Sequence, residues 1–154
     1  TTAYAGGLCH ISNLLCWIFL HTPLTFIERV GHKSREFPYP DDMLIGIDAT
    51  IMEGLVDLKV KNNTNYSFQI QIDVDDKYMY GKILTDDPNF NTYEIKNLNR
   101  RYEKINGETF EEVDIYRNSY DRNKNLIDSQ FLYKNRCHIG YELKENVGIK
   151  EGAF

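Results

Sequence analysis

The stretch GGLCHISNLLCWIFLHTP, residues 6–23, decides the fold because it holds the clearest helical pattern in the chain. Apolar residues recur at helical spacing from Leu8 to Ile18, which predicts a helix over residues 8–21. Aromatic and aliphatic side chains also fill its other faces, and such a helix is buried in a core or in a membrane. The run is shorter than the roughly 20 residues that a bilayer span needs, so we expect it in the core. Pro23 ends it.

Downstream of this helix, apolar and polar residues alternate in short segments, as they do in half-buried strands. Residues 24–33 are expected to be extended, and residues 45–51 and 56–64 to contain short strands. Residues 66–84 predict a hairpin with its turn at Asp75–Asp76, and residues 109–140 predict another around the polar loop 121–125. The predicted fold class is therefore α+β: one buried N-terminal helix packed on an antiparallel sheet, with a further β-hairpin.

The length, net charge and cysteine count of the chain limit the classes of function. With 154 residues, the chain is long enough for one domain with a real core. A net charge of -5 argues against nucleic acid or an anionic membrane surface as a partner, because both favour a basic protein. Three cysteines without dense spacing do not make a disulfide framework. Because the chain starts with Thr1, we expect a fragment of a longer protein.

The chemistry of the chain is expected at the start of the helix. Cys9 follows Gly6 and Gly7 directly and falls in the first helical turn. The positive end of the helix dipole favours the thiolate, which is the nucleophilic form of cysteine. Amide groups in that turn have no acceptor within the helix and could stabilise an oxyanion. We assign Gly6, Gly7, His10 and Ser12 to such an oxyanion or substrate site.

A cysteine nucleophile needs a base, and the base needs an orienting group. His32 at the end of one extended segment and Asp48 on the next predicted strand supply them, giving a Cys9–His32–Asp48 triad. The chain order of Cys, His and Asp, with their elements, is that of papain-like and transglutaminase-like enzymes. This is an analogy of chain order and element type.

Plainer interpretations stay open for each of these residues. Cys9 could be a small buried hydrophobic residue, His32 could lie at a strand end, and Asp48 could bond nearby backbone amides. Cys9, His10, His32 and Asp48 are also acceptable zinc donors, although no CxxC or HExxH spacing supports a metal site. We therefore assign no metal and no cofactor.

Four short motifs follow one another along the chain. They are the GG-x-C helix start with Ser12 and Leu15, the E-R-x-x-H stretch from Glu28 to His32, the D-A-T stretch from Asp48 to Thr50, and the N-N-T stretch from Asn62 to Thr64. In this order they resemble the VanW family. His10 departs from the family's usual glutamine. The resemblance is strongest over residues 4–84 and also extends into the C-terminal part.

The resemblance implies an accessory role in bacterial glycopeptide (vancomycin) resistance, with no reaction assigned. It also implies a VanW-like core over residues 1–88, a C-terminal β-hairpin extension of the same domain over residues 89–154, and a missing N-terminal part. Combined with the triad, it predicts an acyl-transferase or hydrolase acting on cell-wall peptide, with a peptidoglycan-derived peptide or precursor as partner. The alternative is a non-catalytic accessory or binding module with Cys9 in the core. The location is expected to be the cytoplasm or the cell envelope.

Overall fold

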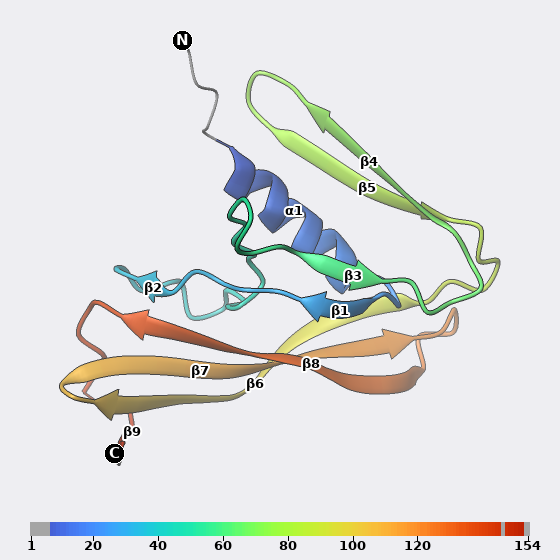
Figure 1. Cartoon of the computed structure of the whole chain (residues 1–154). Coiled ribbons are helices and arrows are strands. Elements are labelled where there is room, and N and C mark those ends of the chain that lie inside the picture. The colour runs from blue at the N-terminus through green and yellow to red at the C-terminus, as the bar shows by residue number, and fades with distance from the viewer. Residues whose placement is uncertain (1–6, 146, 153–154) are drawn as a thin grey trace, which may run out of the picture.

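The computed structural model describes residues 7–145 and 147–152, which form one helix and nine strands (Figure 1). In chain order these elements are α1 (Leu8–Leu20), β1 (Thr25–Glu28), β2 (Ser34–Arg35), β3 (Lys59–Lys61), β4 (Phe68–Val74), β5 (Met79–Thr85), β6 (Thr92–Ile105), β7 (Glu108–Tyr120), β8 (Leu126–Ile139) and β9 (Ile149–Glu151). The mixed α and β class predicted from the sequence is confirmed.

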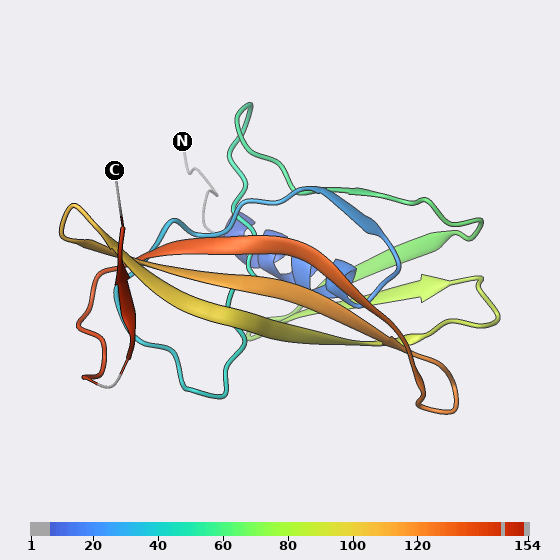
Figure 2. The same ribbon diagram turned by 90° about the horizontal axis from the view of Figure 1, so that it is seen from below.

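The main sheet has five strands in the order β2-β8-β7-β6-β9. Its three long strands pair antiparallel, and β7–β8 is the hairpin predicted around residues 121–125. The two short edge strands, β2 and β9, instead pair in parallel, so the expectation of a purely antiparallel sheet is wrong. Figure 2 shows that the long strands curl along their length.

Two smaller sheets complete the strand set. Strands β1 and β3 pair antiparallel across residues far apart in sequence. Strands β4 and β5 form the predicted hairpin, in unbroken register from Phe68–Thr85 to Val74–Met79. The alternating apolar residues of β4 stay largely open to solvent, because Ile70, Ile72 and Val74 are all exposed.

Helix α1 lies between the β4–β5 hairpin and the five-stranded sheet (Figure 1). Its buried face includes Cys16 and Leu20, while Leu8, Ile11 and Trp17 are exposed. The prediction of a helix buried on nearly all sides is therefore wrong for its first turn, whereas Ile18, Phe19 and Leu20 near its C-terminal end are all buried. The helix ends at Leu20, and the ring of His21 bonds the carbonyl of Trp17 at 2.8 Å, which satisfies one of the last carbonyls. No helix in the described part of the chain is long and apolar enough to cross a bilayer.

The core joins the helix to the long strands. Its buried members come from α1, from the segment 45–49 and from strands β6 and β7: Cys16, Leu20, Ile45, Ala49, Ile95, Val113 and Ile115. Each large side chain buried here contributes roughly 1.5–3 kcal/mol relative to an exposed one. Residues on both sides of position 88 thus share one core.

Residues 45–51 do not form the predicted strand, although they lie in the core. Side chains of other elements satisfy their backbone groups instead of a sheet ladder. The Asn97 amide on β6 accepts the Ile45 N–H at 2.8 Å and donates to the Ile45 carbonyl at 2.9 Å. The Asn13 side chain accepts the Ala49 N–H at 2.9 Å. An apolar run therefore lies in the core with an irregular backbone.

Candidate functional site

The helix start provides the exposed thiol of the site. Gly7 precedes the first turn with φ of 124°, a conformation that side-chain-bearing residues rarely adopt. Cys9 lies in that turn and is exposed, as is His10. Gly6 falls outside the described residues. A packing role for Cys9 therefore has no support, and its sulfur is open to a reactant.

Burial separates Cys9 from the other two cysteines. Burial raises the pKa of the Cys16 thiol to about 11, against a smaller opposing effect of the nearby Arg29 charge. Burial also raises the pKa of Cys137. Both thiols stay protonated at neutral pH and are shielded from solvent, so Cys9 is the cysteine suited to nucleophilic chemistry.

His32 and Asp48 form an imidazole–carboxylate pair. The Asp48 Oδ2 atom accepts the backbone N–H of His32 at 2.7 Å and also contacts the Nδ1 atom of the same residue. The His32 side chain is 49% exposed, and its Nε2 atom lies on the ring edge away from the carboxylate. This arrangement leaves one ring nitrogen available for proton transfer while the other is held, as a general base requires.

Arg29 fixes the carboxylate from its other side. Its Nη2 atom donates to Asp48 Oδ1 at 3.1 Å, and its Nε atom donates to the Asp48 backbone carbonyl at 2.7 Å. Burial alone would raise the pKa of Asp48. The His32 backbone hydrogen bond, the Arg29 charge and the His32 ring outweigh this effect and hold the pKa of that carboxyl below its usual value. Asp48 is therefore ionised at neutral pH and can stabilise a protonated His32.

The main sheet supports Arg29 in turn. Its Nη1 atom donates to the Asn135 side chain on β8 at 2.8 Å, and its guanidinium lies 4.5 Å from the centroid of the Tyr133 ring. The Tyr133 hydroxyl donates to the Gly46 carbonyl at 2.8 Å, which ties the same strand to the segment carrying Asp48. Gly31 has no room for a side chain, because a Cβ atom there would lie 2.7 Å from both Arg29 and Asn135. The sequence motif contained Arg29, but nothing local pointed to Tyr133 or Asn135.

Helix α1 is bonded directly to the segment that carries Asp48. The Ser12 hydroxyl lies 2.6 Å from the Ala49 carbonyl and 3.1 Å from the Cys9 carbonyl. Its single proton favours the shorter bond, so Ser12 joins the helix to residue 49 rather than serving as an open oxyanion donor. Together with Asn13, which accepts the Ala49 N–H, it holds the N-terminal half of α1 against Ala49, the residue after Asp48.

Two of the three residues of the predicted triad contact each other. Within residues 7–145 and 147–152, no hydrogen bond joins the Cys9 sulfur to His32 or Asp48, so the structure pairs His32 with Asp48 and leaves Cys9 unpaired with either. Hydrogen bonds to a catalytic group are often long or misaligned without substrate. Beside Asp48, the Thr50 hydroxyl is buried and has no partner in the described part of the chain.

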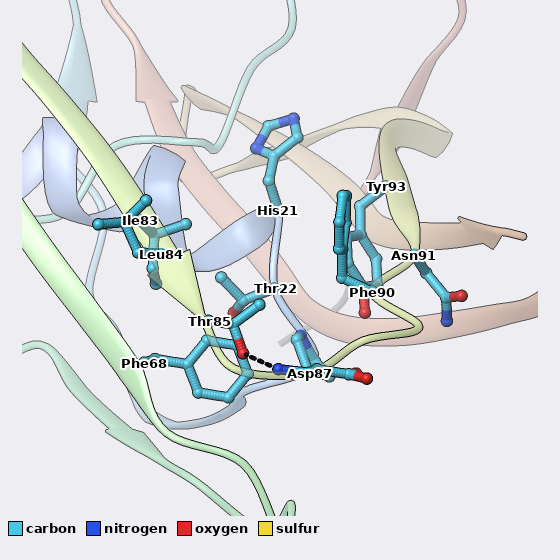
Figure 3. A pocket seen from close by; sticks show the side chains of 11 residues that line it. His21, Thr22, Phe68, Ile83, Leu84, Thr85, Asp87, Phe90, Asn91 and Tyr93 are labelled. Carbon is cyan, nitrogen blue, oxygen red and sulfur yellow. Dashed lines mark hydrogen bonds between the residues drawn. The ribbon is translucent and has the colours of Figure 1, made fainter. Parts of the chain in front are cut away.

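Two hollows flank the helix. A groove of about 480 Å³ runs along α1 past Ile11, Leu15 and Phe19, and it begins at Ser12, one turn from Cys9. A smaller hollow of about 100 Å³ lies at the other end of the helix, where Figure 3 shows His21, Phe90 and Tyr93 around it. Of these two hollows, only the groove is lined by a residue assigned to the candidate site, Ser12. Among the described residues, no three His, Cys, Asp or Glu side chains lie close enough together to hold a metal ion.

Comparison with known proteins places the chain in a family. The family model described as VanW like protein matches residues 1–84, which include Cys9, His32 and Asp48. The chain belongs to the VanW family. It is 42% identical over 153 residues to the vancomycin B-type resistance protein VanW of Enterococcus faecalis. That match covers 98% of the chain and 56% of the relative, so the chain spans about half the length of that protein.

No solved structure matches this VanW-family chain. The analogy with papain-like and transglutaminase-like enzymes therefore has no structural neighbour behind it. The structure shows that residues from three separate sequence motifs bond one another. Ser12 and Ala49 bond each other, and Asp48 bonds both Arg29 and His32.

Proposed function

We propose that this VanW-family chain is a cysteine-dependent hydrolase or acyl-transferase acting on peptide or amino-acid bonds of cell-wall origin. The observation that supports the proposal is the half-exposed His32–Asp48 pair and its link to the helix that carries the exposed Cys9. Asp48 precedes Ala49, the residue that Ser12 and Asn13 bond from that helix. The substrate class follows from the vancomycin resistance named for the relative and from the peptide chemistry of such a triad.

The proposed reaction has two halves. The Cys9 sulfur attacks the carbonyl carbon of the scissile bond as His32 takes the thiol proton, and first-turn amides stabilise the oxyanion. His32 then gives that proton to the departing amine, which leaves a thioester on Cys9. Water or an acceptor amine attacks the thioester, passes a proton to His32, and the thiol is restored when His32 returns it. Asp48 holds the imidazole and stabilises its charged form throughout.

Thiol reactivity tests the proposal. The protein is treated with iodoacetamide at neutral pH, and alkylation of each cysteine is followed by mass spectrometry beside a synthetic peptide of residues 4–14. We expect Cys9 to react about tenfold faster than the peptide thiol, since a thiolate-stabilising site raises the nucleophilic fraction. Cys16 and Cys137 are expected to react only after denaturation, because both are buried.

A matched pair of variants identifies the source of the reactivity. His32→Gln is expected to lower the Cys9 rate to that of the peptide. His138→Gln serves as the control, because His138 also contacts a carboxylate, that of Glu108, but lies on β8. A Cys9 no more reactive than the peptide, or equal rates in the two variants, would contradict the proposal.

A non-catalytic binding module is the second candidate. It is favoured by the missing hydrogen bond between Cys9 and His32 in the described structure and by the open apolar face of β4. Cys9→Ala separates the candidates. If this variant leaves both the free energy of unfolding and the vancomycin susceptibility of a strain carrying the gene unchanged, the binding module is favoured over the enzyme.

A further inference from the structure

A third hollow is lined by the loop after β2, strand β6 and the segment after β8. Its volume is about 330 Å³, and its walls include three tyrosines and an arginine: Tyr39, Tyr102, Tyr141 and Arg100. We call it the tyrosine cavity. Neither Cys9, His32 nor Asp48 lines it, so it is distinct from the candidate active site.

A fully buried carboxylate anchors the wall of the tyrosine cavity. The Arg35 guanidinium donates to both oxygens of Glu111, at 3.0 and 2.9 Å. Arg100 donates to Glu111 Oε2 from Nε at 3.0 Å and from Nη2 at 2.8 Å, and the Tyr102 hydroxyl donates to the same atom at 2.9 Å. Glu111 therefore has its full complement of donors inside the protein.

The charges of this cluster do not balance. Burial works to raise the pKa of Glu111, but hydrogen bonds from Arg35 and Arg100 outweigh it and hold the pKa below its usual value, so the carboxylate is ionised. Two guanidinium groups then face one carboxylate, which leaves one positive charge beside the cavity. A break in the β6–β7 register between Leu98 and Arg101 gives Arg100 its place there, since such a bulge redirects side chains.

The free hydrogen-bonding groups around this charge are donors. Tyr141 accepts two bonds from Arg35, at 3.3 and 2.8 Å, so its own hydroxyl proton remains available. In the part of the chain that the structure describes, the Arg100 Nη1 atom has no hydrogen-bond partner. Tyr102 has already committed its proton to Glu111. The charged acceptors that line the cavity, Asp41 and Glu142, lie at its exposed rim, whereas Arg100 and Tyr141 present free donors, which favours an anionic ligand beside these two residues.

The rim limits the charge of that anion. Asp41 and Lys144 pair across the rim at 3.1 Å, and both are well exposed. Glu142 also lines the cavity and is exposed, so water screens its charge. Because Lys144 already balances Asp41, Glu142 is the rim acid that disfavours a dianion such as a phosphate monoester more than a singly charged group.

We propose that the tyrosine cavity binds a small monocarboxylate, such as an N-acylated amino acid or the C-terminal residue of a short peptide. The carboxylate would meet Arg100 and the Tyr141 hydroxyl, and the apolar part would pack on the tyrosine rings. The cavity volume falls at the lower end of the 300–1,000 Å³ range of ligand sites, which suits a ligand of one or two residues. Half-exposed Tyr39, with its ring 4.8 Å from the Arg35 guanidinium, gives one face of the site.

Binding by the full-length protein tests this site. N-acetylphenylalanine is titrated into isotope-labelled protein while amide chemical shifts are followed, and N-acetylphenylalaninamide, which lacks the charge, serves as the matched probe. We expect saturable shifts at residues around the cavity and at least about tenfold weaker binding of the amide, because a charge-assisted hydrogen bond is lost. Inorganic phosphate is titrated in parallel and is expected to bind more weakly than the carboxylate.

Neighbouring arginines on β6 provide the control. Arg100 and Arg101 have side chains equally exposed, at 40%, but Arg101 pairs with Glu112 outside the tyrosine cavity. Arg100→Gln is expected to weaken binding about tenfold, and Arg101→Gln to change it less than twofold. Tyr141→Phe, which removes only a hydroxyl, gives a milder variant if Arg100→Gln does not fold, and should weaken binding severalfold.

Three outcomes would overturn the assignment. The first is the absence of a saturable chemical-shift change at about 20 mM probe, a concentration well above the millimolar range expected of so small a ligand. The second is binding of the amide or of phosphate as tight as that of the carboxylate. The third is an equal loss of probe affinity in Arg100→Gln and Arg101→Gln. Cys9→Ala is expected to bind the probe normally. Failure of the carboxylate site and failure of the proposed enzyme are therefore separate results.

Discussion

At the scale of single residues, the candidate site depends on one buried arginine. The Arg29 side chain is 4% exposed, and Asp48 is its carboxylate partner. Removing one member of such a pair leaves the other charge buried without compensation, which costs far more than an exposed ion pair contributes. The Arg29–Asp48 contact therefore links the geometry of His32 to the stability of the fold.

We predict that Asp48→Asn lowers the free energy of unfolding at neutral pH by about 2–3 kcal/mol, because Arg29 loses its counter-charge. The native pKa of Asp48 lies below its unfolded value, so its stabilising effect is complete above the unfolded pKa and is lost as pH falls through the native one. Urea unfolding from pH 7 to pH 3 measures this. The difference between the proteins should shrink in acid, and a constant difference would contradict the assigned pKa shift.

Local sequence patterns identified the candidate site residues but not the distant residues that hold them in place. Cys9 at a helix start and the E-R-x-x-H stretch are visible in a few consecutive letters. Tyr133 and Asn135 contact Arg29 from more than 100 positions away, and no local pattern predicts such a contact. Ser12 was placed in the substrate site, whereas its hydroxyl is bonded to Ala49.

At the scale of elements, two helix side chains fix the first turn of α1 against the core. Asn13 accepts the N–H of Ala49, and Ser12 bonds the carbonyl of the same residue. Ala49 is fully buried, so its N–H cannot turn to water if Asn13 is removed. A buried amide without a partner costs about 1–3 kcal/mol.

Asn13→Ala should therefore lower the free energy of unfolding by about 1–2 kcal/mol. The exposed residue His10 on the same helix provides the control, since His10→Ala is expected to change stability by less than about 0.5 kcal/mol. Chemical denaturation monitored by circular dichroism compares the two. Equal and small effects would mean that water replaces the Asn13 oxygen at Ala49.

Helices and strands with a clear pattern in consecutive residues were predicted, and those without such a pattern were missed. Helix α1 and the β4–β5 and β7–β8 hairpins have periodic residues and turn residues close together. The long strand β6 was missed because exposed charged residues such as Lys96 and Arg100 interrupt its pattern. The two- and three-residue strands β2 and β9 exist only through parallel pairing with distant strands. Segment 45–51 has a strand-like composition, but side chains satisfy its backbone.

At the scale of the whole molecule, buried arginines hold separate segments together, and Arg117 on β7 also donates to the Leu24 carbonyl just after α1. Arg29 follows β1 and Arg35 ends β2, and each bonds a carboxylate from another segment, Asp48 or Glu111. The β4–β5 hairpin has no such clamp, and it approaches α1 where Gly81 lies beside Leu14 and Ile18. Stability should therefore differ strongly between the main sheet and the hairpin.

Amide hydrogen exchange should resolve this difference strand by strand. Strand β7 pairs on both sides within the five-stranded sheet and carries fully buried Val113 and Ile115, so its amides should open only with global unfolding. Strand β4 pairs with β5 alone, and Ile70, Ile72 and Val74 are exposed, so its amides can open without disturbing the core. We expect the paired amides of β4 to exchange at least about a hundredfold faster than those of β7 at neutral pH, as sub-global opening requires. Equal protection of the two strands would show that the hairpin and the main sheet unfold as one cooperative unit, and the clamps at Arg29 and Arg35 would then not set the distribution of stability.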